Sequence, residues 1–271
     1  MGFLGQNFLN LDRYEKLKFL YLSGAFFFVI SSYTVMRELK DSVFIYVVGR
    51  SYLPTAKILS MIVLIPAVLL FAYLVDRMRR YRLLCVYTIA FSLIGLVCAY
   101  LLGNPTIGLD NTVSSPYRWF GWFFFFFIEG YSPFIVSLFW AFANSVSSPN
   151  ETKKYYSFMV AGSKIGGMLV AAISWYFFSC QYTGSIVLSS TVKHQLIVAS
   201  SSVLLMIVPI IILWMIRVVP GYRLHGYEAV YKEEKAMKKA GVEKTSIFSG
   251  LWLLLKVPYV MGIFGMIFFY E

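Results

Sequence analysis

Six apolar runs of about 20 residues or more constrain this chain more than any other feature of its sequence. They lie approximately at residues 17–36, 52–75, 83–102, 119–143, 155–178 and 195–216. A helix needs about 20 apolar residues to cross the roughly 30 Å hydrocarbon core of a bilayer. A seventh run begins near Phe248 and reaches Glu271. The sequence therefore predicts an all-α polytopic membrane protein with six spanning helices and the start of a seventh.

The composition argues against a water-soluble globular enzyme. Only 14% of the residues are charged, whereas soluble domains carry roughly 25%. The net charge is +11, but the basic residues are scattered between the apolar runs, which does not favour a nucleic-acid partner. The three cysteines have no C-x-x-C spacing, which argues against a zinc site or a disulfide framework. We expect no catalytic residues, no metal or other cofactor, and the lipid bilayer as the surrounding medium.

The distribution of Lys and Arg predicts the orientation of the chain. If the six runs cross the membrane in turn, sixteen basic residues lie on the side of the N-terminus and five on the opposite side. Cytoplasmic loops carry the excess of Lys and Arg. We therefore expect a cytoplasmic N-terminus and a multi-pass protein of the bacterial inner-membrane type.

The layout of the runs predicts three parts: a six-helix transmembrane bundle at 1–216, a charged cytoplasmic linker at 217–247, and the first helix of a second half at 248–271. Six spans, a long charged connection and a seventh span are typical of a transporter built from two halves. We therefore expect a C-terminal half as the partner of this chain. The alternative is a six-helix protein with a C-terminal hairpin.

Two charges are predicted deep inside the membrane. Glu129 lies ten residues after Trp119, and Lys164 lies nine residues into the fifth run, so both are about 14–15 Å from a surface. Pro133 has no N–H to donate to the carbonyl of Glu129, which predicts a bend there. Glu129 and Lys164 either form a structural ion pair or line a cavity that binds an ionic substrate.

A second group of charges lies at the end of the first run. Arg37, Lys40 and Asp41 have i, i+3, i+4 spacing and share one helical face. A helix from residue 17 to 48 would be about 48 Å long, so either it ends before Arg37 or it is tilted or broken and these charges face a cavity. Lys57 in the second run is either a snorkelling lysine or part of the same group. The slight excess of cations favours an anionic solute.

Small residues in the fifth run indicate close helix packing. Gly162 and Gly166 form a G-x-x-x-G pattern within GSKIGG, which favours a helix–helix contact over a phosphate loop.

Three sequence blocks, in order, resemble those of the ATP/ADP translocases of intracellular bacteria and plastids, a family related in fold to the major facilitator superfamily. SYTVMRELKDSVF is similar to the family's Y-T-x-x-R-x-x-K-D block, and LPTAK to its P-x-x-K block. FWAFANSVSSPNETKKYYSFMVAGS is similar to the longer block that joins spans four and five. Ser32 and Lys164 stand where the family commonly has asparagine.

The resemblance implies an N-terminal six-helix bundle of a major-facilitator-like fold, the first half of a nucleotide carrier that exchanges ATP and ADP by alternating access. Lys40 and Glu129 correspond to a lysine and a glutamate implicated in transport, and the charged loop DRMRRYR resembles a facilitator-type gate. The substrate-binding candidates are Lys40, Arg37, Lys57, Glu129, Asn144 and Lys164. The gating or structural candidates are Asp41, Asp76, Arg77, Glu151 and Lys153. The alternatives are a carrier for another organic anion or metabolite, or a non-transporting membrane fragment.

Overall fold

The computed structural model describes residues 13–179, 189–220 and 256. The predicted seventh helix at 248–271, apart from Lys256, and the predicted linker from residue 221 onward lie outside the described residues. The described part is all-helical and contains six helices that are long and apolar enough to cross a membrane. This confirms the predicted fold class.

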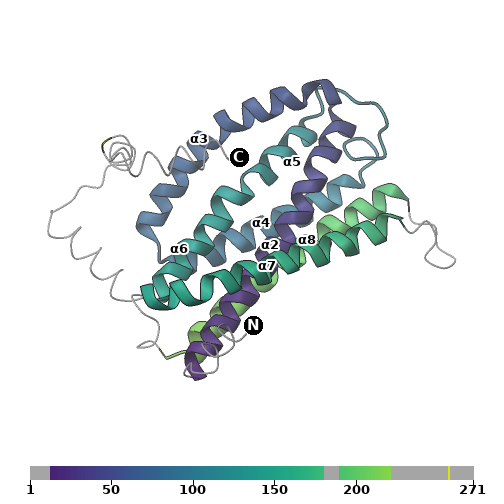
Figure 1. Cartoon of the computed structure of the whole chain (residues 1–271). Helices are drawn as coiled ribbons and strands as arrows, with labels where there is room; N and C mark the ends of the chain where they lie inside the picture. The colour runs from purple at the N-terminus through teal and green to yellow at the C-terminus, as the bar shows by residue number, and fades with distance from the viewer. Residues whose placement is uncertain (1–12, 180–188, 221–255, 257–271) are drawn as a thin grey trace.

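Each of the six predicted runs lies within one observed span (Figure 1). The fourth span consists of two α-helices joined through a π-helical turn, η2, and a short 3-10 turn, η1, precedes the second span. The elements are α2 (Arg13–Val47), η1 (Arg50–Tyr52), α3 (Leu53–Arg77), α4 (Arg80–Leu102), α5 (Trp119–Glu129), η2 (Ser132–Val136), α6 (Ser137–Val146), α7 (Pro149–Ser179) and α8 (Ser190–Val218).

The first span is longer than its apolar run. α2 continues without a break through Arg37 and Lys40 to Val47, over 35 residues, which is about 52 Å of helix. The alternative in which this helix ends before Arg37 is therefore wrong. The charges of this block lie on the helix itself rather than in a loop.

The ends of the spans gather at two ends of the bundle. At one end α2 begins, α3 is followed by α4, α6 is followed by α7, and α8 ends. We call this the basic end, because Lys18, Arg79, Arg80 and Arg217 lie there. The opposite end, which we call the loop end, contains the long connection at 103–118.

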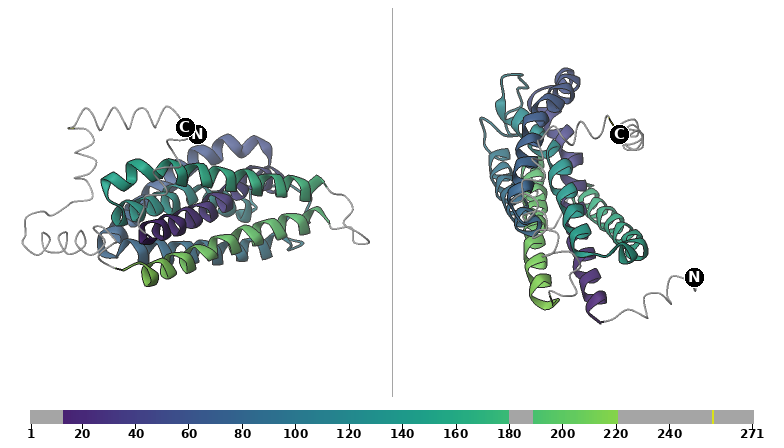
Figure 2. Two further views of the ribbon diagram at one scale, coloured as in Figure 1. Left: turned by 60° about the horizontal axis from the view of Figure 1, so that its bottom comes forward. Right: turned by 90° about the vertical axis from the view of Figure 1, so that its left-hand side faces the viewer.

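Helix α2 lies at the centre of the bundle. α7 and α8 pack along it on two sides, and α4 packs against α8 (Figure 2). In contrast, α3 lies at the margin of the bundle (Figure 1), and Ala56 and Ser60 are the residues that it buries. Most of the apolar surface of α3 is therefore open to lipid or to another protein segment.

The core divides into two apolar clusters with a layer of small polar residues between them. Phe26 and Phe139 stack in the cluster toward the basic end, with ring centroids 4.6 Å apart. Phe44 and Phe125 belong to the cluster toward the loop end. Between the clusters, the fully buried Ser92 of α4 donates a hydrogen bond to the carbonyl of Ser202 in α8 at 2.9 Å. Small side chains at this level let the helix backbones approach closely.

The same close approach joins α2 and α7 at Gly166. A Cβ on Gly166 would lie 2.6 Å from the Phe27 ring and 2.7 Å from Ser31 Oγ, whereas a Cβ on Gly162 would meet nothing within 4 Å. The predicted helix contact is confirmed for Gly166. It is wrong for Gly162, whose α-hydrogen faces open space.

The loop end is held together by one arginine. The guanidinium of Arg118, which precedes α5, donates hydrogen bonds to five backbone carbonyls, those of Val47, Ile107, Gly108, Asn111 and Val113. Thr191 at the start of α8 also donates to Asp110 in the same loop at 2.6 Å. We call these contacts the Arg118 clamp. They fix the loop-end positions of α2, α5 and α8 relative to one another.

Candidate functional site

A break in the fourth span positions Glu129. α5 ends at Glu129, and the π-helical turn η2 begins three residues later and contains Pro133. Because proline has no N–H, the carbonyl of Glu129 loses its usual helical donor, whereas Phe134 N donates to its ordinary i−4 partner, Gly130 O, at 3.3 Å. The α-helix predicted to be disturbed by Pro133 is interrupted here by a π turn, a feature frequent at functional sites.

The side chain of Glu129 forms an ion pair with Lys40 of α2. The two residues are 89 positions apart in the chain and come together because α5 packs against α2. The Lys40 side chain is 11% exposed and that of Glu129 is 33% exposed. Lys40 is thus nearly enclosed, while its carboxylate partner remains open on one side.

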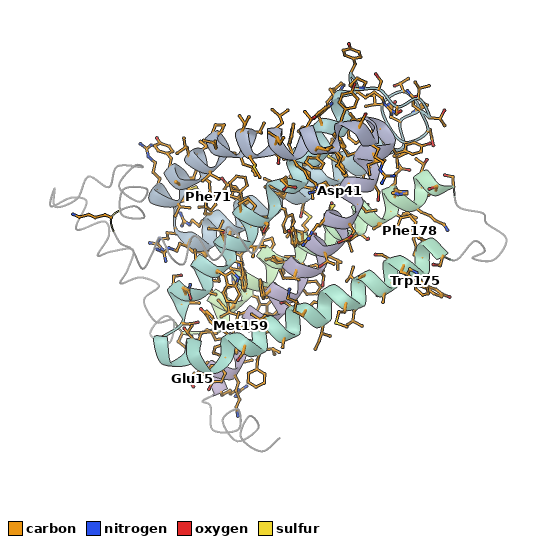
Figure 3. The ribbon with its side chains drawn as sticks, turned by 45° about the horizontal axis from the view of Figure 1, so that its top comes forward. Glu15, Asp41, Phe71, Met159, Trp175 and Phe178 are labelled. Carbon is orange, nitrogen blue, oxygen red and sulfur yellow. The ribbon has the colours of Figure 1, made fainter. Side chains whose placement is uncertain are left out.

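A second carboxylate and an aromatic ring complete the surroundings of the ammonium group. Asp41 Oδ1 lies 3.8 Å from Lys40 Nζ, and the Asp41 side chain is 42% exposed. The centroid of the Phe125 ring lies 4.6 Å from the same nitrogen. Figure 3 shows Asp41 on α2, far from Glu15 at the other end of that helix. The site therefore places one cation against two partly open carboxylates inside the span.

Lys164 lies elsewhere, so the predicted ion pair between Glu129 and Lys164 is wrong. Gly166 packs against Ser31, which places Lys164 near the level of Ser31, nine residues before Lys40 along α2. Nine residues correspond to roughly 13 Å along the helix axis. The predicted common depth is wrong as well, and Lys164 is exposed on α7.

The other substrate-binding candidates are distributed over the bundle. Arg37 lies one turn before Lys40 on α2, and Lys57 lies in the first turns of α3; both are exposed. Asn144 lies near the end of α6 at the basic end, where it accepts a hydrogen bond from the Tyr156 hydroxyl at 2.8 Å. The structure therefore unites Lys40, Asp41 and Glu129 and leaves Asn144 apart from them.

The gating candidates other than Asp41 gather at the basic end. Asp76 and Arg77 lie in the last turn of α3, and Glu151 and Lys153 lie near the start of α7. The Arg77 guanidinium lies over the Tyr73 ring, 4.3 Å from its centroid. The apolar cluster that contains Phe26 and Phe139 lies between these positions and Lys40.

Sequence reasoning missed two cations at the basic end. Lys18 is only 1% exposed, and its ammonium donates to the carbonyl of Val146, the last residue of α6, at 3.3 Å. Arg80 donates to the carbonyl of Ala141 in the same helix at 3.5 Å. A cation at a helix C-terminus is favoured by the helix dipole. In the sequence, Lys18 contributes only to the predicted orientation and Arg80 is one of several arginines in the gate-like loop DRMRRYR, and no spacing signal predicts that either donates to α6.

Comparison with known proteins gives one family. The sequence model of the TLC ATP/ADP transporter family matches residues 2–271. Three curated relatives are each called ADP,ATP carrier protein 1: the Rickettsia bellii protein is 26% identical, and those of Rickettsia prowazekii and Rickettsia typhi are each 24% identical, over 188 residues. Each alignment covers 62% of this chain but only 37% of the relative. No solved structure matches the chain.

Proposed function

Because this chain belongs to the TLC ATP/ADP transporter family, as its three sequence blocks predicted, we propose that it is the N-terminal bundle of a carrier that exchanges ATP and ADP by alternating access. The six long apolar helices make it an integral multi-pass membrane protein. The relatives are named as ADP,ATP carriers, and the matched segment covers about a third of their length, which supports a second bundle supplied from outside the described residues.

The ion pair between Lys40 and Glu129 carries this proposal. A charge inside a membrane span is costly, so such a pair marks a pathway or a structural contact. The exposed side of Glu129 and the π turn behind it favour a pathway. A nucleotide phosphate offers the same kind of acceptor oxygen as the carboxylate, and more negative charge. It can therefore replace Glu129 as the partner of Lys40.

Simple electrostatics favours that replacement. Two unit charges 4 Å apart attract by about 4 kcal/mol at an effective dielectric constant of about 20. One phosphate charge thus replaces the attraction that Lys40 loses when Glu129 leaves. The further negative charges of a di- or triphosphate are available to other cations. Arg37, Lys57 and Lys164 are exposed and serve as those further contacts. Differential binding of this kind shifts the population between carrier conformations.

The orientation belongs to the same proposal. The basic end, where α2 begins, faces the cytoplasm of a bacterial inner membrane because more of the described Lys and Arg residues lie there than at the loop end. Asp76, Arg77, Glu151 and Lys153 then form part of a cytoplasmic gate, and the Arg118 clamp lies on the opposite side.

A transport assay tests the exchange. The full-length carrier in vesicles loaded with ADP should take up labelled ATP, and Lys40→Ala should abolish this uptake. Lys193→Ala is a matched control, because this lysine lies at the loop end, where its ammonium donates to the Phe178 carbonyl at 3.3 Å, and uptake should persist. Uptake that survives Lys40→Ala would show that Lys40 does not hold the nucleotide.

The second candidate function is a carrier for another organic anion. The exposed cation Lys164 on α7 favours it, because an additional positive charge on the bundle surface changes which anions bind well. Competition against one labelled nucleotide separates the two candidates. Competition by ATP and ADP supports exchange, whereas an organic anion that competes when no nucleotide does supports the second function.

A further inference from the structure

We propose that Phe125 is a positioning residue that keeps the Lys40 ammonium group in the site when Glu129 releases it. This inference rests on the proposed function, since it assigns a role within the same site. A cation over an aromatic face is attracted by the ring within about 6 Å of its centroid. The distance from Lys40 Nζ to the Phe125 centroid is 4.6 Å.

Helical spacing explains why the ring and the carboxylate reach the same nitrogen. Phe125 and Glu129 are four residues apart on α5, so they lie on one face of that helix. Lys40 approaches this face from α2 and meets both groups. Of the five consecutive phenylalanines at 123–127, Phe125 therefore has a role beyond packing.

The Phe125 ring and the Glu129 carboxylate differ in how firmly they are held beside Lys40. Phe125 is fully buried, and its ring contacts Phe44 of α2 with centroids 5.1 Å apart. Phe44 in turn packs edge-on against Trp122, also at 5.1 Å. Glu129 is one-third exposed and lies at the end of α5, beside the π turn. The ring is therefore the fixed partner, and the carboxylate is the one that can move.

A fixed ring has a consequence during substrate binding. When a phosphate displaces Glu129, the ring still attracts the ammonium group and limits the rotamers of the lysine side chain. Without the ring, the released ammonium group samples more rotamers, and Asp41 Oδ1, already 3.8 Å from it when the ring is present, becomes its main remaining partner in the site. Loss of the ring should therefore weaken nucleotide binding more than it slows turnover.

Fluorinated phenylalanines test the ring electrostatics at nearly constant shape. One, two or three fluorines on Phe125, introduced into the full-length carrier, should raise the KM for ATP stepwise by roughly twofold to thirtyfold in total, with kcat changed less than twofold. Phe124 provides the matched control, because it is equally buried on the same helix and packs on Phe120 at 6.0 Å. A flat series at Phe125, or equal responses at both positions, would overturn the proposal.

A stability cycle tests the contact without transport. Phe125→Leu, Lys40→Met and the double variant are compared by thermal unfolding of the purified full-length protein. Non-additive midpoints, shifted by about 1 °C per kcal/mol of coupling in a protein this large, support the contact, and the cycle of Lys40→Met with Phe124→Leu should be additive. Additivity at Phe125 overturns the proposal. If the wild type exchanges no nucleotide, coupling in this cycle still supports the positioning of Lys40 by Phe125, and the substrate assignment alone fails.

Discussion

At the scale of single residues, Glu129 is the side chain whose charge the site depends on. It pairs with Lys40, and in the proposed exchange it leaves when a phosphate arrives. A partner that competes with substrate lowers the affinity of the empty carrier, but it also helps to release the product. The exposed side of Glu129 and the adjoining π turn are consistent with both tasks.

Glu129→Gln should therefore tighten nucleotide binding and slow exchange. Removing the negative charge weakens the competition for Lys40, so the KM for ATP should fall roughly tenfold, the scale of a hydrogen bond to a charged group. Initial uptake rates over a range of ATP concentrations provide the measurement. Glu38→Gln, which changes an exposed carboxylate two residues from Lys40, should leave the KM unchanged. A KM that rises in Glu129→Gln contradicts the competition.

At the scale of elements, the fourth span combines two helices and a π turn where the other described spans are regular α-helices. Proline alone does not produce this. Pro66 in α3 and Pro209 in α8 lie inside helices that continue through them. The break at Pro133 comes shortly after Gly130 and lies next to the ion pair between Lys40 and Glu129. The residues that interrupt the helix are therefore the ones beside the site.

Pro133→Ala should stabilise the fold and impair transport. Alanine restores an N–H that can donate to the Glu129 carbonyl, and proline inside a helix costs about 3 kcal/mol. The unfolding midpoint should rise by about 1 °C per kcal/mol gained in a protein this large, while the exchange rate falls because the helix next to Glu129 becomes regular. Thermal unfolding and vesicle uptake measure the two effects. In Pro66→Ala uptake should be retained, and full activity of Pro133→Ala would show that the break has no role in transport.

At the scale of the whole molecule, the two ends differ in charge and in construction. The basic end contains two cations that donate to carbonyls of α6, the buried Lys18 and the half-buried Arg80. The loop end contains the Arg118 clamp. The apolar core is divided by the small polar layer, and the site of Lys40 and Glu129 lies within the cluster toward the loop end.

The orientation of these ends can be measured with single cysteines. In a variant without Cys85, Cys98 and Cys180, a cysteine replacing the exposed Ser114 should react with a membrane-impermeant maleimide in intact cells. A cysteine replacing Arg13 should react only after the cells are permeabilised, because the N-terminus is proposed to be cytoplasmic. The reversed labelling pattern would reverse the proposed topology.

The sequence predicts the spans and the bend at Pro133 well, because apolar length and a missing N–H are local properties. It does not predict the partner of Glu129. The predicted depth of Lys164 counts from Tyr155, but α7 begins at Pro149, and such a count assumes that each helix enters the membrane at the first residue of its apolar run. The pairing of Lys40 with Glu129 depends on how α2 and α5 lie together, and a residue spacing of 89 contains no such information.

The Arg118 clamp also has a consequence for biosynthesis. Its five carbonyl partners come from the end of α2 and from the connection after α4, all of which precede Arg118 in the chain. The clamp can therefore close as soon as the ribosome has delivered the start of the fourth span, before α7 and α8 exist. The hydrogen bond from Thr191 to Asp110 can then join α8 to a loop end that has already closed.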